Sequence, residues 1–214
     1  MKKQIRYASL SALLLLTFVL WTVLLGVVDV RPIGPHGSVV GFATFNQTVH
    51  ELTGVHMTVY HITDWLGLVP IATAFGFAIL GLVQWIGRRK LARVDYSLFV
   101  LGGFYLVVMA VYLLFEYIVI NYRPVLIHGF LETSYPSSTT LLVLCVMPTA
   151  LMQLNSRIRR YWLRRCVALL IIAFIVFMVA GRLISGVHWI TDIIGGMLLS
   201  AGLVTAYQFT IKLK

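Results

Sequence analysis

Charged side chains, and acidic ones above all, are scarce in this sequence of 214 residues. Only 11% of the residues are charged and just 7 are Asp or Glu, whereas 60% are hydrophobic. A soluble domain carries about 25% charged residues, so the composition excludes an ordinary soluble protein. The mean hydropathy of +0.93 indicates a chain whose solvent is a lipid bilayer.

Cysteine is equally rare. Cys145 and Cys166 are the two cysteines, both in or beside apolar segments and without the spacing of metal ligands. This pattern favours inert thiols over a disulfide framework or a metal site. Because the sequence also offers no cluster of carboxylates, we expect neither a metal nor another cofactor.

Six apolar runs are each long enough to cross a membrane, for which a helix needs about 20 residues. We place them at residues 8–28, 62–86, 96–120, 139–154, 167–183 and 189–211. The first is longer than the apolar core of a secretory signal and lacks a small-residue cleavage site, so we expect it to be retained. The sequence thus predicts an all-α, polytopic membrane bundle of six helices, forming a single domain over residues 1–214.

The formal charge of +10 is unevenly distributed. Basic residues gather at both termini and in the loops after the second and fourth runs, which leaves Arg31, Arg123 and Arg182 for the other side. Cytoplasmic loops retain Lys and Arg, so we predict cytoplasmic termini and a polar site on the outer face. The basic clusters lie between apolar runs, which argues against a nucleic-acid partner. Contact with anionic membrane lipids is one interpretation of these clusters, and a topology signal alone is the other.

Arg123 and Arg182 suggest an oxyanion site, because one guanidinium group can donate two parallel hydrogen bonds to two oxygens of a phosphate. Snorkelling toward lipid headgroups is the alternative for either arginine. His188 and Asp192 are spaced i, i+4, so the carboxylate can hold the imidazole in one tautomer. The alternative is that Asp192 merely favours the positive N-terminal end of the last helix.

Ser137, Ser138 and Thr139 come just before or at the start of the fourth apolar run. Such residues suit a helix N-cap, and the free backbone N–H groups there bind anions. A plain cap explains the three residues equally well, unless the two arginines and the His-Asp pair converge on the same end of the bundle.

Together these segments resemble the type 2 phosphatidic acid phosphatase superfamily, the membrane lipid phosphatases related to vanadium haloperoxidases. That family has Lys-x6-Arg-Pro, then Pro-Ser-Gly-His, then Ser-Arg-x5-His-x3-Asp, and the order agrees over residues 116–196. The matching residues are Arg123, Pro124, Pro136, Ser137, Arg182, His188 and Asp192. The resemblance implies that His188 attacks phosphorus, that Asp192 orients it, and that Arg123, Arg182 and Ser137, with Ser138 beside it, bind the phosphoryl oxygens.

Three positions depart from the family pattern. Glu116 replaces the Lys, Thr139 replaces the His that protonates the leaving group, and Gly181 replaces the Ser before the second arginine. Glu116 has three interpretations: it repels an anionic substrate, binds a cationic headgroup, or turns away from the site. His128, in the same outer loop, is a candidate substitute acid, although a loop histidine is more often simply solvated.

The loss of a general acid matters least for a leaving group that needs no proton, such as phosphate near neutral pH. We therefore expect a lipid diphosphate, such as undecaprenyl pyrophosphate, to be a better substrate than phosphatidic acid. The predicted function is a lipid phosphatase or diphosphatase facing outward from a plasma membrane, with a bacterial one as our expectation.

Two other functions stay open: a catalytically impaired relative that binds lipid phosphates, and a phosphotransferase that uses the same histidine. A transporter is disfavoured because paired broken helices are missing from the pattern. We expect Glu116 and Asp192 to be the sole carboxylates within the spans, both near the outer boundary. The sequence does not indicate an oligomeric state.

Overall fold

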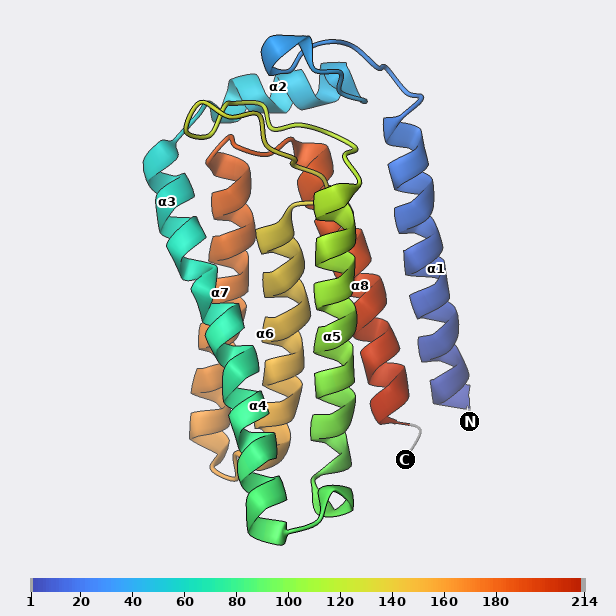
Figure 1. Ribbon diagram of the computed structural model, residues 1–214, viewed down its shortest axis with the longest axis vertical. Helices are drawn as coiled ribbons and strands as arrows, with labels where there is room; N and C mark the ends of the chain where they lie inside the picture. Colours follow the sequence, from blue (N-terminus) through green and yellow to red (C-terminus); the bar gives the residue numbers. More distant parts are fainter. Residues whose placement is uncertain (1, 213–214) are drawn as a thin grey trace.

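The computed structural model describes residues 2–212, and within them all regular elements are helical (Figure 1). The α-helices are α1 (Lys2–Leu25), α2 (Ala43–Thr53), α3 (Met57–Leu66), α4 (Leu68–Arg88), α5 (Tyr96–Tyr117), α6 (Ser138–Arg157), α7 (Tyr161–Ile184) and α8 (Ile190–Ile211), with 3-10 turns at Pro35–Gly37 and Leu91–Arg93. Six of the resulting helical segments are long and apolar enough to cross a membrane, α3 and α4 together making one. The predicted all-α, six-span bundle is confirmed.

The second span differs from its prediction. It runs over Met57–Arg88, beginning five residues before the predicted start at residue 62, and is interrupted at Gly67. Pro70 explains the interruption, since its ring removes the N–H that would bond the Leu66 carbonyl and crowds that carbonyl. The earlier start adds residues 57–61, and among them Tyr60 lies with Thr63 and Asp64 at the end of the span near α2.

The helices α6 and α8 form the centre of the bundle, with a larger buried share than any other span among the described residues. Glycine permits this close packing: a β-carbon on Gly195 of α8 would lie 2.4 Å from the Tyr135 ring, just before α6. On its other side α8 packs along α1, where the Ser11 hydroxyl donates to the Gly202 carbonyl at 2.9 Å. The last span is therefore enclosed on two sides.

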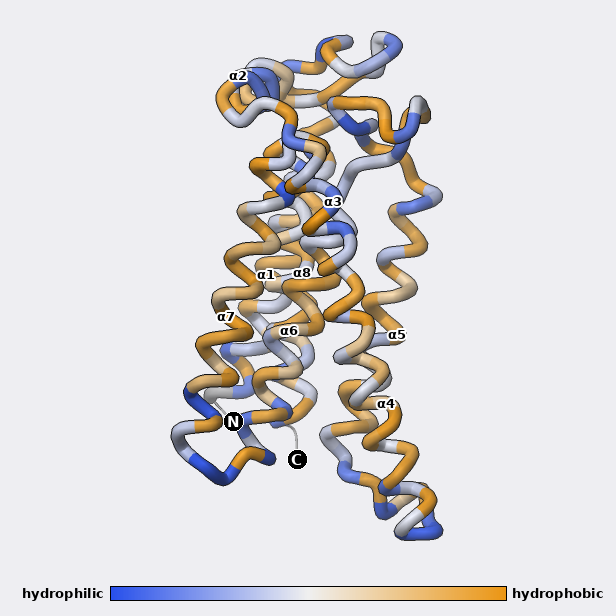
Figure 2. Tube along the Cα trace, turned by 90° about the vertical axis from the view of Figure 1, so that its left-hand side faces the viewer, coloured by the Kyte–Doolittle hydropathy of each residue, from blue (hydrophilic) through white to orange (hydrophobic). Residues whose placement is uncertain are grey.

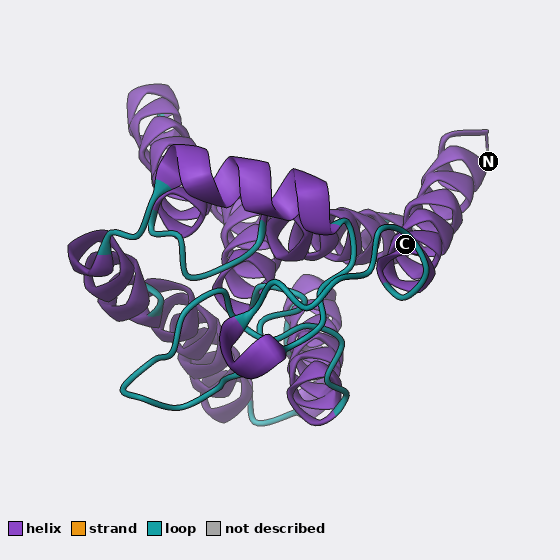
Figure 3. Ribbon diagram, turned by 90° about the horizontal axis from the view of Figure 1, so that it is seen from above, coloured by secondary structure: helices purple, strands orange, loops and turns teal. Residues whose placement is uncertain are grey.

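The segment between α1 and α3 folds over one end of the bundle, and α2 crosses above the long helices (Figures 1 and 3). Asn46 of α2 is fully buried and joins this cap to α8. Its amide nitrogen donates to Thr191 Oγ1 at 3.0 Å and to the Gly41 carbonyl at 2.8 Å. Its amide oxygen accepts from the Thr191 N–H at 3.3 Å. The cap is thus tied to the first turn of α8.

Polar residues concentrate at the two ends of the bundle, and the spans between them are apolar (Figure 2). The helix α1 begins and α8 ends at the end opposite the cap (Figure 1). At that end Arg88 and Arg157 both pair with Asp95, at 2.9 and 3.7 Å. The basic residues therefore gather as the sequence indicates, although Lys214 lies outside the described residues. The side of the membrane that each end faces stays a prediction.

Candidate active site

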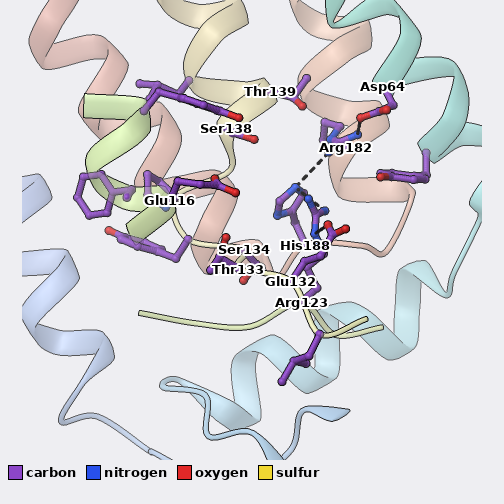
Figure 4. Close-up of a pocket in the computed structure, with 17 residues that line it drawn as sticks. Asp64, Glu116, Arg123, Glu132, Thr133, Ser134, Ser138, Thr139, Arg182 and His188 are labelled. Carbon is purple, nitrogen blue, oxygen red and sulfur yellow. Dashed lines mark hydrogen bonds and ion pairs between the residues drawn. The ribbon is translucent and has the colours of Figure 1, made fainter. Parts of the chain in front are cut away.

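A cavity of about 530 Å³ lies at the cap end of the bundle, between α3, α5, α7 and the segment that leads into α6 (Figure 4). This volume falls in the usual range of about 300–1,000 Å³ for small-molecule sites. The polar and charged residues in its wall are Tyr60, Asp64, Tyr112, Glu116, Arg123, Glu132, Thr133, Ser134, Tyr135, Ser138, Thr139, Arg182 and His188. They come from four helices and two loops that are distant in sequence.

Two arginines converge on one nitrogen of His188. Arg123 Nη1 lies 3.2 Å and Arg182 Nη2 3.3 Å from His188 Nε2. A guanidinium group can only donate hydrogen bonds, so Nε2 is the acceptor and the unprotonated nitrogen of the ring. The proton of the neutral imidazole is then on Nδ1, which lies 3.7 Å from Asp192 Oδ2. Nε2 therefore has a lone pair directed at the two cations.

Asp192 is fully buried, and its carboxylate accepts hydrogen bonds from neighbouring groups. The Trp189 N–H donates to its Oδ2 at 2.9 Å, and the side-chain amide of Asn121 donates to its Oδ1 at 3.2 Å. The first contact is that of a residue that caps the start of α8, so Asp192 both caps this helix and faces His188. Its main-chain oxygen accepts from the Ser137 N–H at 3.1 Å, which also joins α8 to the start of α6.

The surroundings of His188 keep its imidazole neutral. Burial in the bundle, followed by the positive charges of Arg123 and Arg182, holds the pKa of His188 well below its ordinary value. His188 lies between α7 and α8, with 3% of its surface exposed. Near neutral pH the ring is thus available as a nucleophile and does not compete with the arginines for an anion.

Each arginine also has a carboxylate partner that the sequence pattern did not reveal. Arg123 Nε lies 3.0 Å from Glu132 Oε2, and Arg182 Nη1 lies 3.6 Å from Asp64 Oδ1. The expectation that Glu116 and Asp192 are the sole carboxylates of the spans was wrong, because Asp64 lies in the second one. A carboxylate in an apolar run is itself a pointer to a functional site; Glu132, in a polar loop, carries no such signal.

The three residues at the start of α6 are divided between the core and the cavity. Ser137 is fully buried, outside the cavity wall, and its hydroxyl accepts from Thr140 Oγ1 at 3.0 Å. Ser138 and Thr139 line the cavity. The sequence grouped Ser137 with the phosphate-binding residues, whereas the structure places the Ser138 hydroxyl, not that of Ser137, beside the space near the arginines (Figure 4).

Of the two remaining candidates, Glu116 lines the cavity and His128 does not. Glu116 lines the cavity, which excludes the interpretation that it turns away. His128 is exposed in a tight turn closed by the pairing of Ile127 with Phe130, and it is not part of the cavity wall. Its backbone has a φ of 51°, which places the residue at the tip of the turn. The structure therefore does not bring this histidine to the site.

A helical membrane bundle with a buried histidine between two arginines defines a polytopic membrane protein with a polar cavity at one end. Residues 116–212, slightly less than half of the chain, match the family model of the PAP2 superfamily. The match contains Arg123, Ser137, Arg182, His188 and Asp192. The resemblance that these motifs indicate is thereby confirmed.

A solved structure shares the fold over nearly the whole chain. It is the crystal structure of a transmembrane PAP2-type phosphatidylglycerolphosphate phosphatase from Bacillus subtilis. The similarity covers 96% of this chain and 98% of that one, with a TM-score of 0.55 and 19% sequence identity. No curated protein sequence matches the chain. At this identity the structural likeness establishes the fold of the bundle, and the site must be argued from its own residues.

Proposed function

We propose that this protein is a membrane lipid phosphatase that hydrolyses a lipid-linked phosphate through a phosphohistidine at His188. The observation that carries the proposal is the contact of both arginines with Nε2 of this one buried, neutral imidazole. A tetrahedral phosphoryl group that replaces these contacts would have its oxygens at the guanidinium groups and its phosphorus facing the lone pair. The PAP2 match over residues 116–212 supports the same chemistry.

The reaction proceeds in two displacements. In the first, a bond forms between His188 Nε2 and phosphorus while the bond to the leaving oxygen breaks, and Asp192 stabilises the positive charge on the ring. Arg123 and Arg182 neutralise the phosphoryl oxygens throughout. In the second, water attacks phosphorus, the N–P bond breaks, and inorganic phosphate leaves with His188 neutral again. The side chains of this chain supply each of these roles without a cofactor.

The favoured substrate is a lipid diphosphate such as undecaprenyl pyrophosphate. Thr139 lines the cavity and stands where the family has the histidine that protonates the leaving group. A threonine hydroxyl cannot protonate an alkoxide effectively. A phosphate leaving group needs little protonation near neutral pH. Lipid diphosphates therefore lose less from the Thr139 replacement than phosphatidic acid does.

The setting that we propose is a bacterial plasma membrane with the cavity facing outward. The distribution of basic residues supports this orientation, since they gather at the end of the bundle away from the cavity. The carrier lipid would then present its phosphate at the outer surface, where water for the second displacement is abundant.

A second candidate function is phosphate-lipid binding without turnover, or transfer of the phosphoryl group to an acceptor other than water. The ion pairs of Arg123 with Glu132 and of Arg182 with Asp64 argue for slow turnover, because an incoming phosphate must displace both carboxylates before it reaches His188. Glu116 adds a third negative charge to the cavity wall. Retention of His188 and Asp192 favours catalysis.

The test is phosphate release by the purified protein in detergent from undecaprenyl pyrophosphate, undecaprenyl phosphate and phosphatidic acid. We expect release that is fastest from the diphosphate and that His188→Ala abolishes. Faster release from phosphatidic acid would overturn the diphosphate preference. Absence of release from all three, with binding intact, would favour the second candidate, and release that depends on an added lipid or glycan acceptor would identify a phosphotransferase.

A further inference from the structure

Asp64 and His188 contact two neighbouring nitrogens of the same guanidinium group. Arg182 Nη1 lies 3.6 Å from Asp64 Oδ1, and Arg182 Nη2 lies 3.3 Å from His188 Nε2. These two nitrogens form the end of the guanidinium fork and donate along a common edge. The carboxylate and the imidazole therefore lie at the two ends of that edge, with Arg182 between them (Figure 4).

A phosphoryl group fits along this edge of Arg182. Bound through two parallel hydrogen bonds, it accepts from both Nη1 and Nη2 and takes the place of Asp64 on Nη1. One side of its phosphorus then faces His188 Nε2. The opposite side faces Asp64, which the incoming oxygen has displaced from the arginine and which lines the cavity.

The side of phosphorus opposite Nε2 is where oxygens leave and enter. In-line displacement requires the leaving oxygen to depart from that side, and the water that later breaks the N–P bond to arrive there. Thr139, which replaces the family's proton-donating histidine, lies on the same side of the cavity as Asp64 (Figure 4). A phosphate leaving group needs no proton, but the attacking water still needs a base.

The other carboxylates of the site are placed less suitably for this task. Glu116 reaches into the cavity from the far side, away from His188 (Figure 4). Glu132 lies 3.0 Å from Nε of Arg123, whereas Nη1 of that arginine contacts His188, and these two nitrogens donate in different directions. Asp192 is fully buried on the Nδ1 side of the imidazole.

Asp64 can move from the arginine and exchange a proton with water. Its side chain is 57% exposed, whereas that of Arg182 is 2% exposed. The guanidinium group has a further neighbour in Thr63, whose Oγ1 lies 3.5 Å from Nη1. The arginine is therefore held in position when the carboxylate leaves it.

We propose that Asp64 is the general base of the second displacement. As water attacks phosphorus, the new O–P bond forms, one water proton passes to the Asp64 carboxylate, and the electron pair of the N–P bond returns to His188 Nε2. After phosphate leaves, Asp64 releases the proton to water and pairs with Arg182 again. The inference rests on the proposed function. It assigns a catalytic residue to α3, outside the segment that matches the family model.

The test follows phosphohistidine and inorganic phosphate separately after the purified protein is mixed with undecaprenyl pyrophosphate in detergent. Asp64→Asn keeps the shape of the side chain and removes the base. We expect a fast first turnover that yields one undecaprenyl phosphate per protein molecule, which also shows that the variant is folded. Steady release of phosphate should then be roughly 100-fold slower or more, the range for a general base. Phosphohistidine, which survives an alkaline quench, should accumulate in the variant only.

A purely electrostatic effect of Asp64 predicts a different result. If the carboxylate only obstructs Arg182, Asp64→Asn should lower KM and leave kcat equal or higher, whereas loss of a base lowers KM and kcat together. Glu132→Gln is the matched control, because it removes the carboxylate partner of the other arginine; it should not accumulate phosphohistidine. Glu51→Gln, exposed on α2 and outside the cavity, should behave as the wild type does.

Steady release by Asp64→Asn at or above the wild-type rate would overturn the inference. Slow release without phosphohistidine would overturn it too, since the first displacement would then be the impaired step. Both results leave the proposed function intact if His188→Ala abolishes release. A wild-type protein that forms neither phosphohistidine nor phosphate would overturn the proposed function and this inference together.

Discussion

Gly181 on α7 lies so close to Thr63 on α3 that a β-carbon at position 181 would be 2.6 Å from Thr63 Cγ2. The Thr63 hydroxyl is also near the next residue of α7, with Arg182 Nη1 3.5 Å from Oγ1. The family has a serine where this chain has Gly181. Thr63 fills the space that the serine side chain would need, and it brings a hydroxyl to the arginine from the neighbouring helix.

Replacing Gly181 with serine is therefore expected to destabilise the protein. Thr63 is fully buried and cannot move aside freely, so the overpacking should cost about 1–3 kcal/mol. Thermal unfolding in detergent measures the effect. Gly102→Ala is the matched control, because a β-carbon at Gly102 meets nothing within 4 Å; it should be neutral or slightly stabilising. An unchanged melting temperature for Gly181→Ser would contradict the close packing of α3 on α7.

Replacing Asp192 with asparagine should lower kcat/KM by roughly 100-fold or more, because the imidazolium that forms during attack would lose its negative partner. Asn121→Ala should have a smaller effect of about tenfold, since Asp192 keeps its second donor, the Trp189 N–H. Phosphate release at saturating and limiting substrate measures both. A larger loss for Asn121→Ala than for Asp192→Asn would argue against Asp192 as the orienting group.

The pH dependence of kcat/KM should report the lowered pKa of His188. The neutral ring is the reactive form, so activity falls when pH drops through the pKa of His188 in the free protein. Because burial and two guanidinium charges lower this pKa, the acidic limb should lie below the ordinary imidazole value of about 6.5. Removing one positive charge, by Arg123→Gln, should weaken activity and move the limb to higher pH.

The control for this profile is the titration of the substrate, because a phosphate ester itself loses a proton near pH 6. Phosphorus NMR measures the ionisation of the substrate, and the pH profile of kcat/KM is corrected for it. A limb at or above 6.5 in the wild-type protein would show that His188 is not held neutral by its surroundings.

Asn46→Ala should weaken both the fold and the reaction, although Asn46 does not line the cavity. It would leave the buried Thr191 N–H and the Gly41 carbonyl without this partner, at a cost of about 1–3 kcal/mol. Since Thr191 adjoins Asp192, the first turn of α8 should shift and kcat should fall more than KM rises. Gln47→Ala, on the exposed side of α2, is the control and should change neither stability nor rate.

The sequence was sufficient for the number and approximate positions of the spans and for part of the site. Arg182, His188 and Asp192 lie within eleven residues of one another, so local spacing decides their geometry, and the structure does bring Arg123 to the same histidine. Asp64 could not be grouped with them, because hydropathy does not state which helix ends are neighbours. Only the packing of α3 on α7 brings it to Arg182.

Ser137 shows a second limit of local patterns. Its position before a helix suits an N-cap, and its match to the family motif implies a phosphate-binding hydroxyl, but neither indicates how far the side chain is buried. The approach of α8 to this segment, which Gly195 and Gly196 allow, encloses the side chain. Burial of a small polar residue depends on its neighbours from elsewhere in the chain, and no local pattern records it.

The packing of α1 along α8 has a consequence for what counts as a unit of this protein. The family match begins at Glu116 and ends at Lys212, just after α8, so it leaves out α1, the cap, α3, α4 and nearly all of α5. Yet Leu15 of α1 is seated against Gly202, and Arg182 meets Thr63 and Asp64 only through α3. The segment that matches the family model is thus shorter than the set of helices that packs around the site. Any attempt to transplant the chemistry must carry the less recognisable half of the chain with it.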